Sequence, residues 1–502
     1  MRRLILFVIV IISLGGCKDG SKNQNYTPDF KSIDRFLEQS ILDWNVPGMA
    51  VGIIYDDSIV LSKGYGYMDL IEKDPVTDST LFGIASLTKG FSALAIGMAQ
   101  YQAYLDINKP IKFYLPQFKT QNDSLTNNIN FVDILSHRTG YSTFSGDLSW
   151  YGNLKSKYQV LESIKSIPVS NDLRSVYGYS NVMYLTAGLA LEAATGQNFE
   201  SFVTDFILSP LKMYNTTFDY SKVIQSSNTA TPHVVENNKP MPINYVNWSN
   251  MAPAGGLFSN VVDLLKWAQF QWNPNYSYID SVYFNAQHEI ITKQRFSWLD
   301  NLNGDEIKMK GYGLGWEIIE IGSYKTISHN GGLDGMISQI VVVPEMKCAI
   351  VVLANSGSAL PIILGYELSH RLLIDSKNTY YNLSLRKIKE NASIDRKTEF
   401  DQEQKRDLSY MVGEYYDSLM GGVSIVNSNA HHYELKFEQA TLFDATIFVD
   451  NKGKIVLQWK NILSLPNGEI VEIDTINNIL KSFTIRCPNP DFRFEEINFR
   501  RR

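Results

Sequence analysis

The sequence predicts an α+β fold in which helices flank an antiparallel sheet and an all-helical subdomain is inserted, followed by a small all-β, barrel-like domain. Three patterns support this prediction: a β-rich hairpin near residue 56, a series of short strands from 311 to 355, and short alternating strands from 408 onward. The chain of 502 residues exceeds a typical single domain, so at least two domains are expected.

The N-terminus has the features of an export signal. A basic start precedes an apolar run over Leu4–Leu14, and a helix of this length, about 16 Å, is too short to span about 30 Å of hydrocarbon. The segment LGGC that follows resembles the bacterial lipobox, in which the cysteine is acylated after cleavage. We therefore expect a signal peptide over 1–16, a lipid on Cys17 and a flexible tether over 17–28. This places the protein in a bacterial cell envelope, anchored to a membrane and facing the periplasm or the exterior. A plain signal peptide with an incidental cysteine is the alternative.

Residues 29–374 are expected to form one domain whose sheet joins both of its ends. Apolar residues at helical spacing predict a helix over 30–44, and two β-rich runs around Asp56-Asp57 predict a hairpin. The pattern from 130 to 270 is mostly helical. Strands separated by short turns return at 311, and such strands should pair antiparallel. A helix over 359–374 closes the domain.

The rest of the chain has a different character. Charged and polar residues over 375–405 predict a linker or a solvated helix. Short alternating strands with glycine-rich turns then predict a β-rich domain over 406–502.

Composition excludes several classes of function. The formal net charge of −6, with no basic run interleaved with aromatic residues, gives no reason to expect nucleic acid as a partner. No cysteine and histidine cluster has metal-ligand spacing, so no metal or other cofactor is expected. Cys348 is expected to be a small, buried, apolar side chain, and a disulfide with Cys487 is not expected. The adjacent His431 and His432 read as exposed strand-end residues rather than metal ligands.

Ser86 and Lys89 are the first candidate catalytic pair. They lie three residues apart at the start of an apolar helix, so both project from one face. A serine hydroxyl is a weak nucleophile until a neighbouring base takes its proton, and a lysine can be that base when burial keeps it neutral. The helix N-terminus adds N–H groups that can hold an oxyanion. A capping serine beside a solvated lysine is the structural alternative.

Other candidates have to be weighed against chance. The pattern S-x-x-K occurs three times and Y-x-N five times, so neither is specific alone. H-x-G occurs once, at His329-Asn330-Gly331, followed by Gly332. These glycines would let backbone approach a substrate closely. No G-x-S-x-G is present, which argues against a nucleophile-elbow hydrolase.

The order of three motifs carries a family resemblance. Ser86-Leu87-Thr88-Lys89, then Tyr179-Ser180-Asn181, then His329-Asn330-Gly331 resembles the serine β-lactamases and penicillin-recognising hydrolases. The likeness is greatest to the branch of class C β-lactamases, D-aminopeptidases, DD-peptidases and esterases. Framework segments such as VPGMAVGII, DILSHRTGY and PAGGLFSNVVDLLKWAQ extend it over roughly residues 30–372. It implies a β-lactamase/transpeptidase-like fold.

The resemblance also implies roles for individual residues. Ser86 would form the acyl-enzyme, and Lys89 and Tyr179 would share the proton transfers, with either one as the base. Asn181 would bond to the substrate amide or to the lysine. The backbone N–H groups of Ser86 and Gly332 would form the oxyanion hole.

His329 departs from many relatives, which have a lysine in K-T-G at this position. That lysine helps to bind the carboxylate of β-lactams and peptidoglycan stems. A histidine is mostly neutral at pH 7 and attracts an anion less. We therefore expect efficient β-lactamase activity to be absent.

Together these features predict an exported, lipid-anchored serine hydrolase that acts through an acyl-enzyme on a small peptide, amide or ester. The alternative is a lipoprotein that binds penicillin or peptide without turnover and acts as a sensor or scaffold. The C-terminal β domain resembles the lipocalin-like domains appended to many such hydrolases, where it would cover the active-site cleft or bind a partner.

Overall fold

The computed structural model describes residues 28–236, 239–295, 307–373, 380–393, 406–429, 432–461, 465–489 and 491–502. The expected signal peptide, Cys17, most of the expected tether and His431 lie outside these ranges. Within the described residues, no helix combines the length and the apolar character needed to cross a bilayer.

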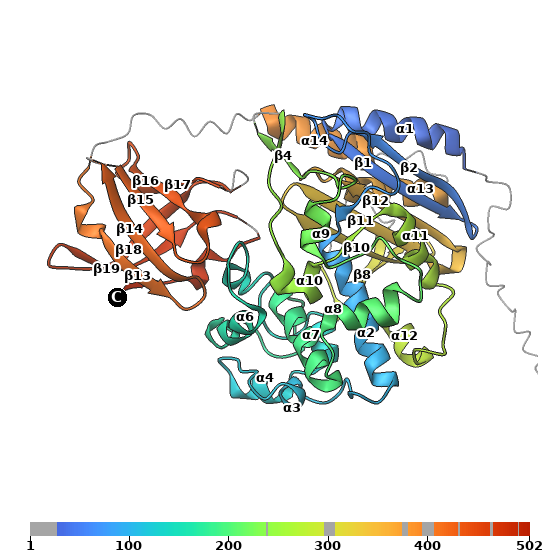
Figure 1. Cartoon of the computed structure of the whole chain (residues 1–502), viewed down its shortest axis with the longest axis horizontal. Helices are drawn as coiled ribbons and strands as arrows, with labels where there is room; N and C mark the ends of the chain where they lie inside the picture. Colours follow the sequence, from blue (N-terminus) through green and yellow to red (C-terminus); the bar gives the residue numbers. More distant parts are fainter. Residues whose placement is uncertain are drawn as a thin grey trace, which may run out of the picture.

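An antiparallel sheet of eight strands forms the centre of the first domain (Figure 1). Its spatial order is β2, β1, β12, β11, β10, β9, β8, β7, so the N-terminal hairpin pairs with the last strand of the domain, as predicted. The strands are β1 (Gly48–Tyr55), β2 (Ser58–Gly66), β7 (Thr292–Lys293), β8 (Ile307–Tyr312), β9 (Glu317–Ile321), β10 (Tyr324–Leu333), β11 (Met336–Val343) and β12 (Cys348–Ala354). Two further pairs are β3 (Phe82–Gly83) with β6 (Phe258–Ser259), and β4 (His233–Glu236) with β5 (Lys239–Pro242).

The predicted hairpin has a two-residue turn. Tyr55 pairs with Ser58, and both intervening residues have positive φ angles, +49° for Asp56 and +64° for Asp57. Such a turn matches the twist of the flanking strands. Strand β1 is buried over seven of its eight residues, so it lies at the centre of the core and not at its margin.

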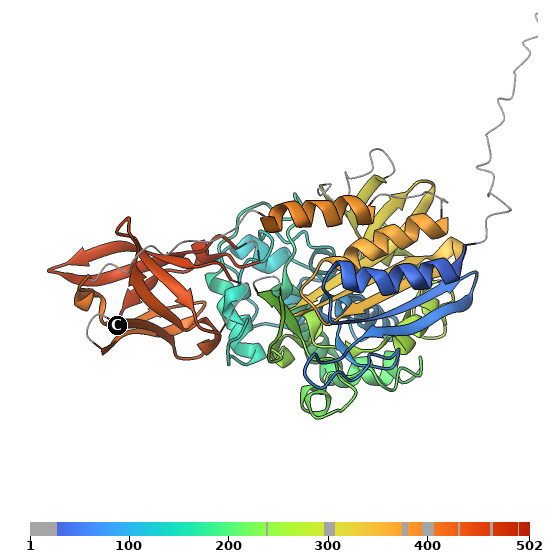
Figure 2. The ribbon, with the colours of Figure 1, turned by 90° about the horizontal axis from the view of Figure 1, so that it is seen from above.

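Helices cover both faces of the sheet. Three of them, α1 (Phe30–Asp43), α13 (Leu360–Leu373) and α14 (Tyr380–Ser393), pack on one face, as Figure 2 shows from above. The opposite face packs on α2 (Thr88–Tyr101), α11 (Val261–Phe270) and the helical subdomain. The remaining helices are α3 (Ile111–Tyr114), α4 (Asp123–Asn128), α5 (Phe131–Leu135), α6 (Lys157–Ser163), α7 (Asn181–Thr195), α8 (Phe199–Val203), α9 (Tyr220–Ile224), α10 (Ala252–Gly255) and α12 (Ser281–Gln287).

The range 375–405, expected as a linker or solvated helix, contains a helix that belongs to the first domain. Tyr380 and Tyr381 of α14 are buried at 0% and 5% exposure, and the Tyr381 hydroxyl donates to Asp43 Oδ2 at 2.7 Å. The range is rich in charged residues, so its composition did not indicate the apolar stripe of α14 that is buried against α1 and α13. The helical alternative therefore holds for α14, but this helix packs on the first domain and is solvated on one face only, while 374–379 and 394–405 lie outside the described residues.

The second domain is a closed barrel of eight antiparallel strands, which confirms the predicted β architecture. Closure is made by β13 pairing with β20. The strands are β13 (Gly413–Asp417), β14 (Gly421–Asn429), β15 (His432–Phe437), β16 (Ala445–Val449), β17 (Ile455–Trp459), β18 (Gly468–Ile476), β19 (Ile479–Arg486) and β20 (Phe499–Arg501). Both Cys348 and Cys487 are free thiols.

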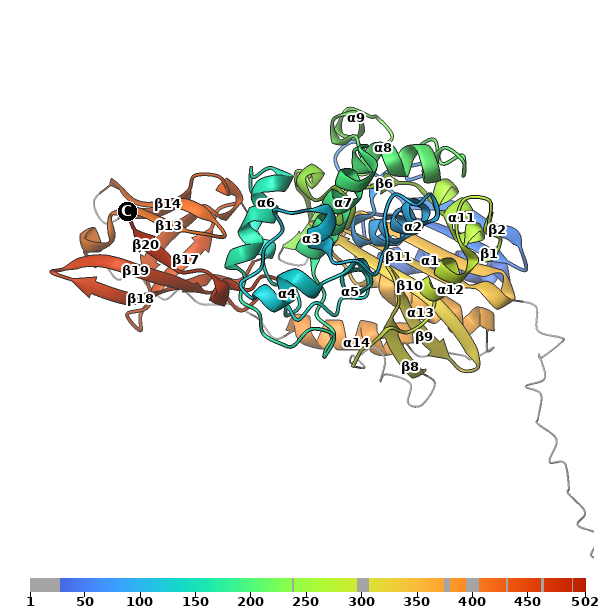
Figure 3. The ribbon, with the colours of Figure 1, turned by 90° about the horizontal axis from the view of Figure 1, so that it is seen from below.

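The barrel docks on the helical subdomain, which lies between it and the sheet (Figure 3). Gly146 N donates to Glu496 Oε2 at 2.8 Å, and Lys155 Nζ donates to the Leu419 carbonyl at 2.6 Å. The ring of Tyr151 lies 4.6 Å from that of Phe492. The apolar core is continuous across this junction, so the two domains bury surface against each other.

Candidate active site

Ser86 lies in a short 3₁₀ turn, Ala85–Leu87, that connects β3 to α2. Ala85 has a φ of +45°, in the left-handed region that side chains other than glycine and asparagine rarely adopt. This strained residue directly precedes the serine. Ser86 remains partly exposed and lines a cavity, whereas its neighbours Ala85 and Leu87 are buried. The turn therefore presents the hydroxyl to a potential substrate.

Lys89 is fully buried in the first turn of α2, directly behind the serine. Its Nζ atom lies 3.1 Å from Ser86 Oγ, 2.8 Å from Asn181 Oδ1 and 2.7 Å from the Ala254 carbonyl oxygen. Burial lowers the pKa of Lys89 to about 7, and the negative charge of Asp147 offsets part of this effect. The amine therefore titrates near neutral pH.

The partners of Lys89 suit its neutral form. A neutral amine has two N–H donors and one lone pair. Asn181 Oδ1 and the Ala254 carbonyl can only accept, so they take the two donors. In the ammonium form the third N–H donates to Ser86 Oγ, whereas in the neutral form the lone pair faces that oxygen and the Ser86 O–H can donate to it.

Tyr179 approaches the serine from the loop before α7. Its hydroxyl lies 2.7 Å from Ser86 Oγ. Burial raises the pKa of Tyr179 above its ordinary value, so the phenol keeps its proton and donates it in this hydrogen bond. The Lys89 Nζ atom also lies 4.7 Å from the centre of the Tyr179 ring. A buried, neutral His137 packs with its ring centre 4.3 Å from that of Tyr179, and its Nδ1 accepts from Ser180 N.

A buried carboxylate extends the site beyond the predicted residues. Asn181 Nδ2 donates to Asp147 Oδ2 at 2.7 Å, and Trp150 Nε1 donates to Asp147 Oδ1 at 2.9 Å. Because the carboxylate accepts from Nδ2, the amide of Asn181 must turn its oxygen toward Lys89. Burial raises the pKa of Asp147 to about 7. Asp147 belongs to no motif, and its only sequence signal is an acidic residue among small and aromatic residues in the segment SGDLSWYG.

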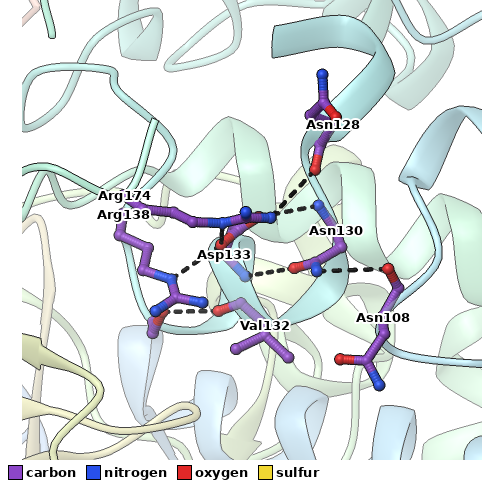
Figure 4. Close-up of polar contacts among 8 residues, drawn as sticks. Asn108, Asn128, Asn130, Val132, Asp133, Arg138 and Arg174 are labelled. Atoms are coloured by element: carbon purple, nitrogen blue, oxygen red, sulfur yellow. Dashed lines mark hydrogen bonds and ion pairs between the residues drawn. The ribbon is translucent and has the colours of Figure 1, made fainter. Parts of the chain in front are cut away.

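An ion-pair network holds the loops around Tyr179 (Figure 4). Asp133 is fully buried and accepts from Arg138 Nε at 2.9 Å and from Arg174 Nε at 2.8 Å. It also forms a reciprocal capping box with Asn130 at the start of α5. The two arginines belong to loops that meet again where Gly178 N donates to the His137 carbonyl at 2.8 Å. The network thus fixes the segment that ends at Tyr179.

His329 lies on β10 and is buried and neutral. Burial, followed by the nearby charge of Lys89, lowers the pKa of His329 to about 3. Its Nδ1 lies 2.6 Å from the Asn330 carbonyl, so Nδ1 carries the proton, and its Nε2 accepts from the Tyr312 hydroxyl at 2.7 Å. Both ring nitrogens are therefore occupied. His329 cannot offer a positive charge to a substrate carboxylate.

The two glycines after Asn330 have different surroundings. A Cβ atom on Gly331 would lie 2.2 Å from the carbonyl oxygen of Ile84, so this glycine allows β10 to pass directly against the segment before Ser86. Gly332 is exposed and lines the same cavity as Ser86. Both glycines were expected to let the backbone approach a substrate closely. Gly332 lines the cavity, whereas Gly331 allows β10 to pack against Ile84, two residues before Ser86.

The cavity has a volume of about 590 Å³ and is formed by both domains. The barrel contributes Leu465, Asn489, Asp491 and Phe492, which no sequence pattern indicated. Four acidic side chains belong to its lining: Asp147, Glu317, Asp334 and Asp491. Within the described part of the chain, the lining includes no lysine or arginine. This cavity is of a size typical of small-molecule sites, and its described lining offers an anion no lysine or arginine as a partner.

The fold thus brings Ser86, Lys89, Tyr179, Asn181, His329 and Gly332 to one cavity or directly behind it, from segments more than 200 residues apart. Cys17 lies outside the described residues. No group of three or more histidine, cysteine or acidic side chains in the described ranges is placed to bind a metal ion.

Comparisons with known proteins agree with this architecture. The model of the Beta-lactamase family matches residues 33–361. Protein flp of Staphylococcus aureus (strain MW2) is 26% identical over 334 residues, which cover 65% of this chain and 63% of flp. The match therefore spans less than two thirds of that relative.

Two solved structures show the same fold at low sequence identity. The octameric penicillin-binding protein homologue from Pyrococcus abyssi has a TM-score of 0.62 at 20% identity and covers 94% of this chain and 99% of its own, so the match includes the barrel. A D-stereospecific amidohydrolase from Streptomyces sp. has a TM-score of 0.55 at 19% identity, over 68% of this chain and 99% of its own. Since the family model matches well over half of the chain, this protein belongs to the beta-lactamase family of serine hydrolases.

Proposed function

We propose that the chain is an exported, lipid-anchored hydrolase that transfers the acyl group of a peptide, amide or ester to Ser86 and then to water. The observation that carries the proposal is the arrangement at the serine. Its Oγ atom lies 3.1 Å from a buried amine and 2.7 Å from a phenol, at the wall of a cavity large enough for a small substrate.

Lys89 is the base in this proposal. At neutral pH a large fraction of the amine is unprotonated, and its lone pair faces the serine hydroxyl. As the Ser86 Oγ–C bond forms, the hydroxyl proton passes to Nζ. The ammonium that results is held by Asn181 Oδ1 and the Ala254 carbonyl. Asp147 stabilises that positive charge from the far side of Asn181.

Tyr179 acts as the acid. Its raised pKa keeps the phenol protonated, so it can give a proton to the leaving nitrogen or oxygen as the carbonyl bond to that atom breaks. Proton transfer from Lys89 to the phenolate then restores the tyrosine. Water repeats the sequence on the acyl-enzyme, with Lys89 again taking a proton. The backbone N–H groups of Ser86 and Gly332 stabilise the oxyanion in both steps.

The charge of the cavity restricts the substrate. His329 is neutral and the lining is acidic, so a carboxylate on the substrate gains no ionic partner there. We therefore propose that uncharged or cationic amides and esters are preferred and that β-lactams are poor substrates. Turnover of nitrocefin near the diffusional limit would contradict this part of the proposal.

Labelling and turnover test the proposal together. A fluorophosphonate probe should label the purified protein, and the label should be lost in Ser86→Ala. Multiple turnovers of an uncharged ester or a D-amino-acid amide distinguish an enzyme from a binding protein that acylates and stops. Lys89→Ala and Tyr179→Phe should each lower kcat by at least about 10²-fold, the usual contribution of general acid–base catalysis. Near-normal rates in both variants would contradict the assigned roles.

The anchor is tested separately. The proposed lipid on Cys17 predicts that the full-length protein sediments with membranes and that Cys17→Ala is released into the soluble fraction. Mass spectrometry of the N-terminal peptide should show an acylated cysteine. An unmodified Cys17 in the mature protein would contradict the anchor without affecting the catalytic proposal.

A further inference from the structure

A second cavity adjoins the catalytic one along the seam between the two domains. Its volume is about 1020 Å³. Tyr151, Val234 and Asp334 line both cavities, and the Tyr151 hydroxyl donates to Asp334 at their shared wall. The first domain contributes one side of this seam cavity, and the barrel contributes Thr441, Leu442, Lys460 and Asn461.

Amide side chains dominate the polar lining of the seam cavity. Five asparagines belong to it: Asn153, Asn244, Asn247, Asn250 and Asn461. The charged residues of the lining already have partners. Lys155 donates to Ser163 and to the Leu419 carbonyl, and Lys460 pairs with Glu434 at 2.5 Å. Its asparagines therefore offer uncharged hydrogen-bonding groups, while its charged side chains are already engaged by partners within the protein.

Two of these amides have unused hydrogen-bonding capacity. Asn153 is 8% exposed, and its Oδ1 accepts from Lys155 N at 3.0 Å, but its Nδ2 has no partner among the described residues. Asn250 Nδ2 donates to the Lys155 carbonyl at 3.1 Å, but its Oδ1 has none. One donor and one acceptor are thus unsatisfied in the same wall. An unsatisfied buried group calls for a partner, and among the unpartnered buried side-chain groups of the described residues only these two belong to residues that line the seam cavity.

We propose that the seam cavity binds the main chain of a peptide substrate, at a part remote from the scissile carbonyl. The inference rests on the proposed function, because the catalytic cavity next to it must act on that same chain. Each peptide unit has one N–H and one C=O, which match the unused acceptor of Asn250 and the unused donor of Asn153. The volume is at the upper end of small-molecule sites and accommodates several residues.

The lining favours a peptide over a glycan. A sugar ring packs on an open aromatic face, and only two aromatic residues belong to the described lining of the seam cavity. The Tyr151 ring is covered by Phe492 at 4.6 Å, and the Tyr245 ring lies 5.7 Å from that of Phe258. Aromatic contacts within the protein thus already engage both rings. The barrel would then select substrates by length, because it forms one side of the cavity.

Competition against a short ester tests the inference. N-acetylated, C-amidated alanine peptides of three and seven residues, in L and D series, would compete with hydrolysis of p-nitrophenyl butyrate by the full-length protein. We expect the heptapeptide of one series to have an inhibition constant at least about tenfold lower than its tripeptide. The advantage should disappear in Asn244→Trp and in Asn461→Trp, which fill the cavity from either domain at exposed positions. Asn127→Trp, at an exposed asparagine of α4 outside both linings, should keep it.

The outcomes separate the two proposals. Equal inhibition by both lengths in the wild-type protein, or a length advantage that survives both tryptophan variants, overturns the seam site and leaves the hydrolase proposal intact. Stronger competition by an N-acetylglucosamine tetramer than by either heptapeptide, lost in the same variants, overturns the peptide assignment. Absence of fluorophosphonate labelling and of ester turnover overturns the proposed function and the seam site with it.

Discussion

Asp147 provides the most direct test of whether Lys89 is the base. One amide separates the two groups, with Lys89 Nζ 2.8 Å from Asn181 Oδ1 and Asn181 Nδ2 2.7 Å from Asp147 Oδ2. A negative charge at Asp147 stabilises the ammonium form of Lys89 and so raises its pKa. Removal of that charge in Asp147→Asn should lower the pKa of Lys89 below about 7. The amine would then be neutral, and able to act, at a lower pH.

The size of the shift follows from the spacing. Two unit charges roughly 7 Å apart at an effective dielectric of about 20 attract by about 2.4 kcal/mol, which corresponds to about 1.7 pH units. The carboxyl of Asp147 itself titrates near pH 7 and is only partly charged there, so we expect an observed shift of about one unit. The plateau rate should also fall by about tenfold, because an asparagine at 147 cannot accept from both Trp150 and Asn181.

The assay is the pH dependence of kcat/KM for an uncharged ester between pH 4.5 and 9, with product measured by chromatography. The acid limb reports the base of the free enzyme. It should have its midpoint near pH 7 in the wild-type protein and about one unit lower in Asp147→Asn. Asp263→Asn is the matched control, since Asp263 is fully buried but lies outside the cavity lining. An unchanged midpoint in Asp147→Asn, or a shift to higher pH, would refute Lys89 as the base.

Three further outcomes are expected. Gly331→Ala should lower the free energy of unfolding in urea by about 1–3 kcal/mol, because the new Cβ would lie 2.2 Å from the Ile84 carbonyl oxygen. Gly332→Ala should change it by less than about 0.5 kcal/mol, because its Cβ would meet only the Ile337 side chain at 3.5 Å. Equal effects of the two variants would contradict the packing role of Gly331. Burial raises the pKa of Asp491, so at a pH above that pKa Asp491→Asn removes a negative charge and should narrow the rate difference between an uncharged p-nitrophenyl ester and its carboxylated analogue, an effect that added salt should reduce. Burial raises the pKa of Glu496, so the folded state loses stability as pH rises from the ordinary glutamate pKa through the raised one. Glu496→Gln should flatten the fall of Tm over that range, and an unchanged slope would show that this carboxyl does not cause the fall.

The sequence predicted those parts of the fold that depend on local pattern. The hairpin at Asp56-Asp57 needs two residues that tolerate positive φ, and aspartates flanked by β-rich runs supply that signal directly. The pairing of β1 with β12 followed from short turns and from one set of strands at each end of the domain. Helix α14 was misjudged because its charged face dominates its composition, while its apolar stripe is short.

The site was predictable only where residues belong to an ordered set of motifs. Ser86, Lys89 and Tyr179 could be named because their motifs, in this order, resemble those of a known family, and the fold brings Lys89 and Tyr179 within hydrogen-bonding distance of Ser86. Asp147 and Asp491 could not be named, because a carboxylate acquires its role from burial and from neighbours distant in sequence. The neutrality of His329 was expected from its ordinary pKa, but its real cause is burial together with two hydrogen bonds.

The neutral charge of His329 affects the electrostatic potential of a cavity that both domains line. A lysine at this position would place a fixed positive charge beside Ser86 and would raise the cost of protonating Lys89, which is already buried and titrates near pH 7. A neutral histidine, held by Tyr312 and by its own backbone, removes that repulsion and leaves acidic groups to set the potential. Two of those groups, Asp334 and Asp491, belong to different domains. We therefore propose that substrate selection depends on the docked barrel as well as on Ser86 and Lys89, because the barrel forms part of the wall of the cavity that Ser86 lines.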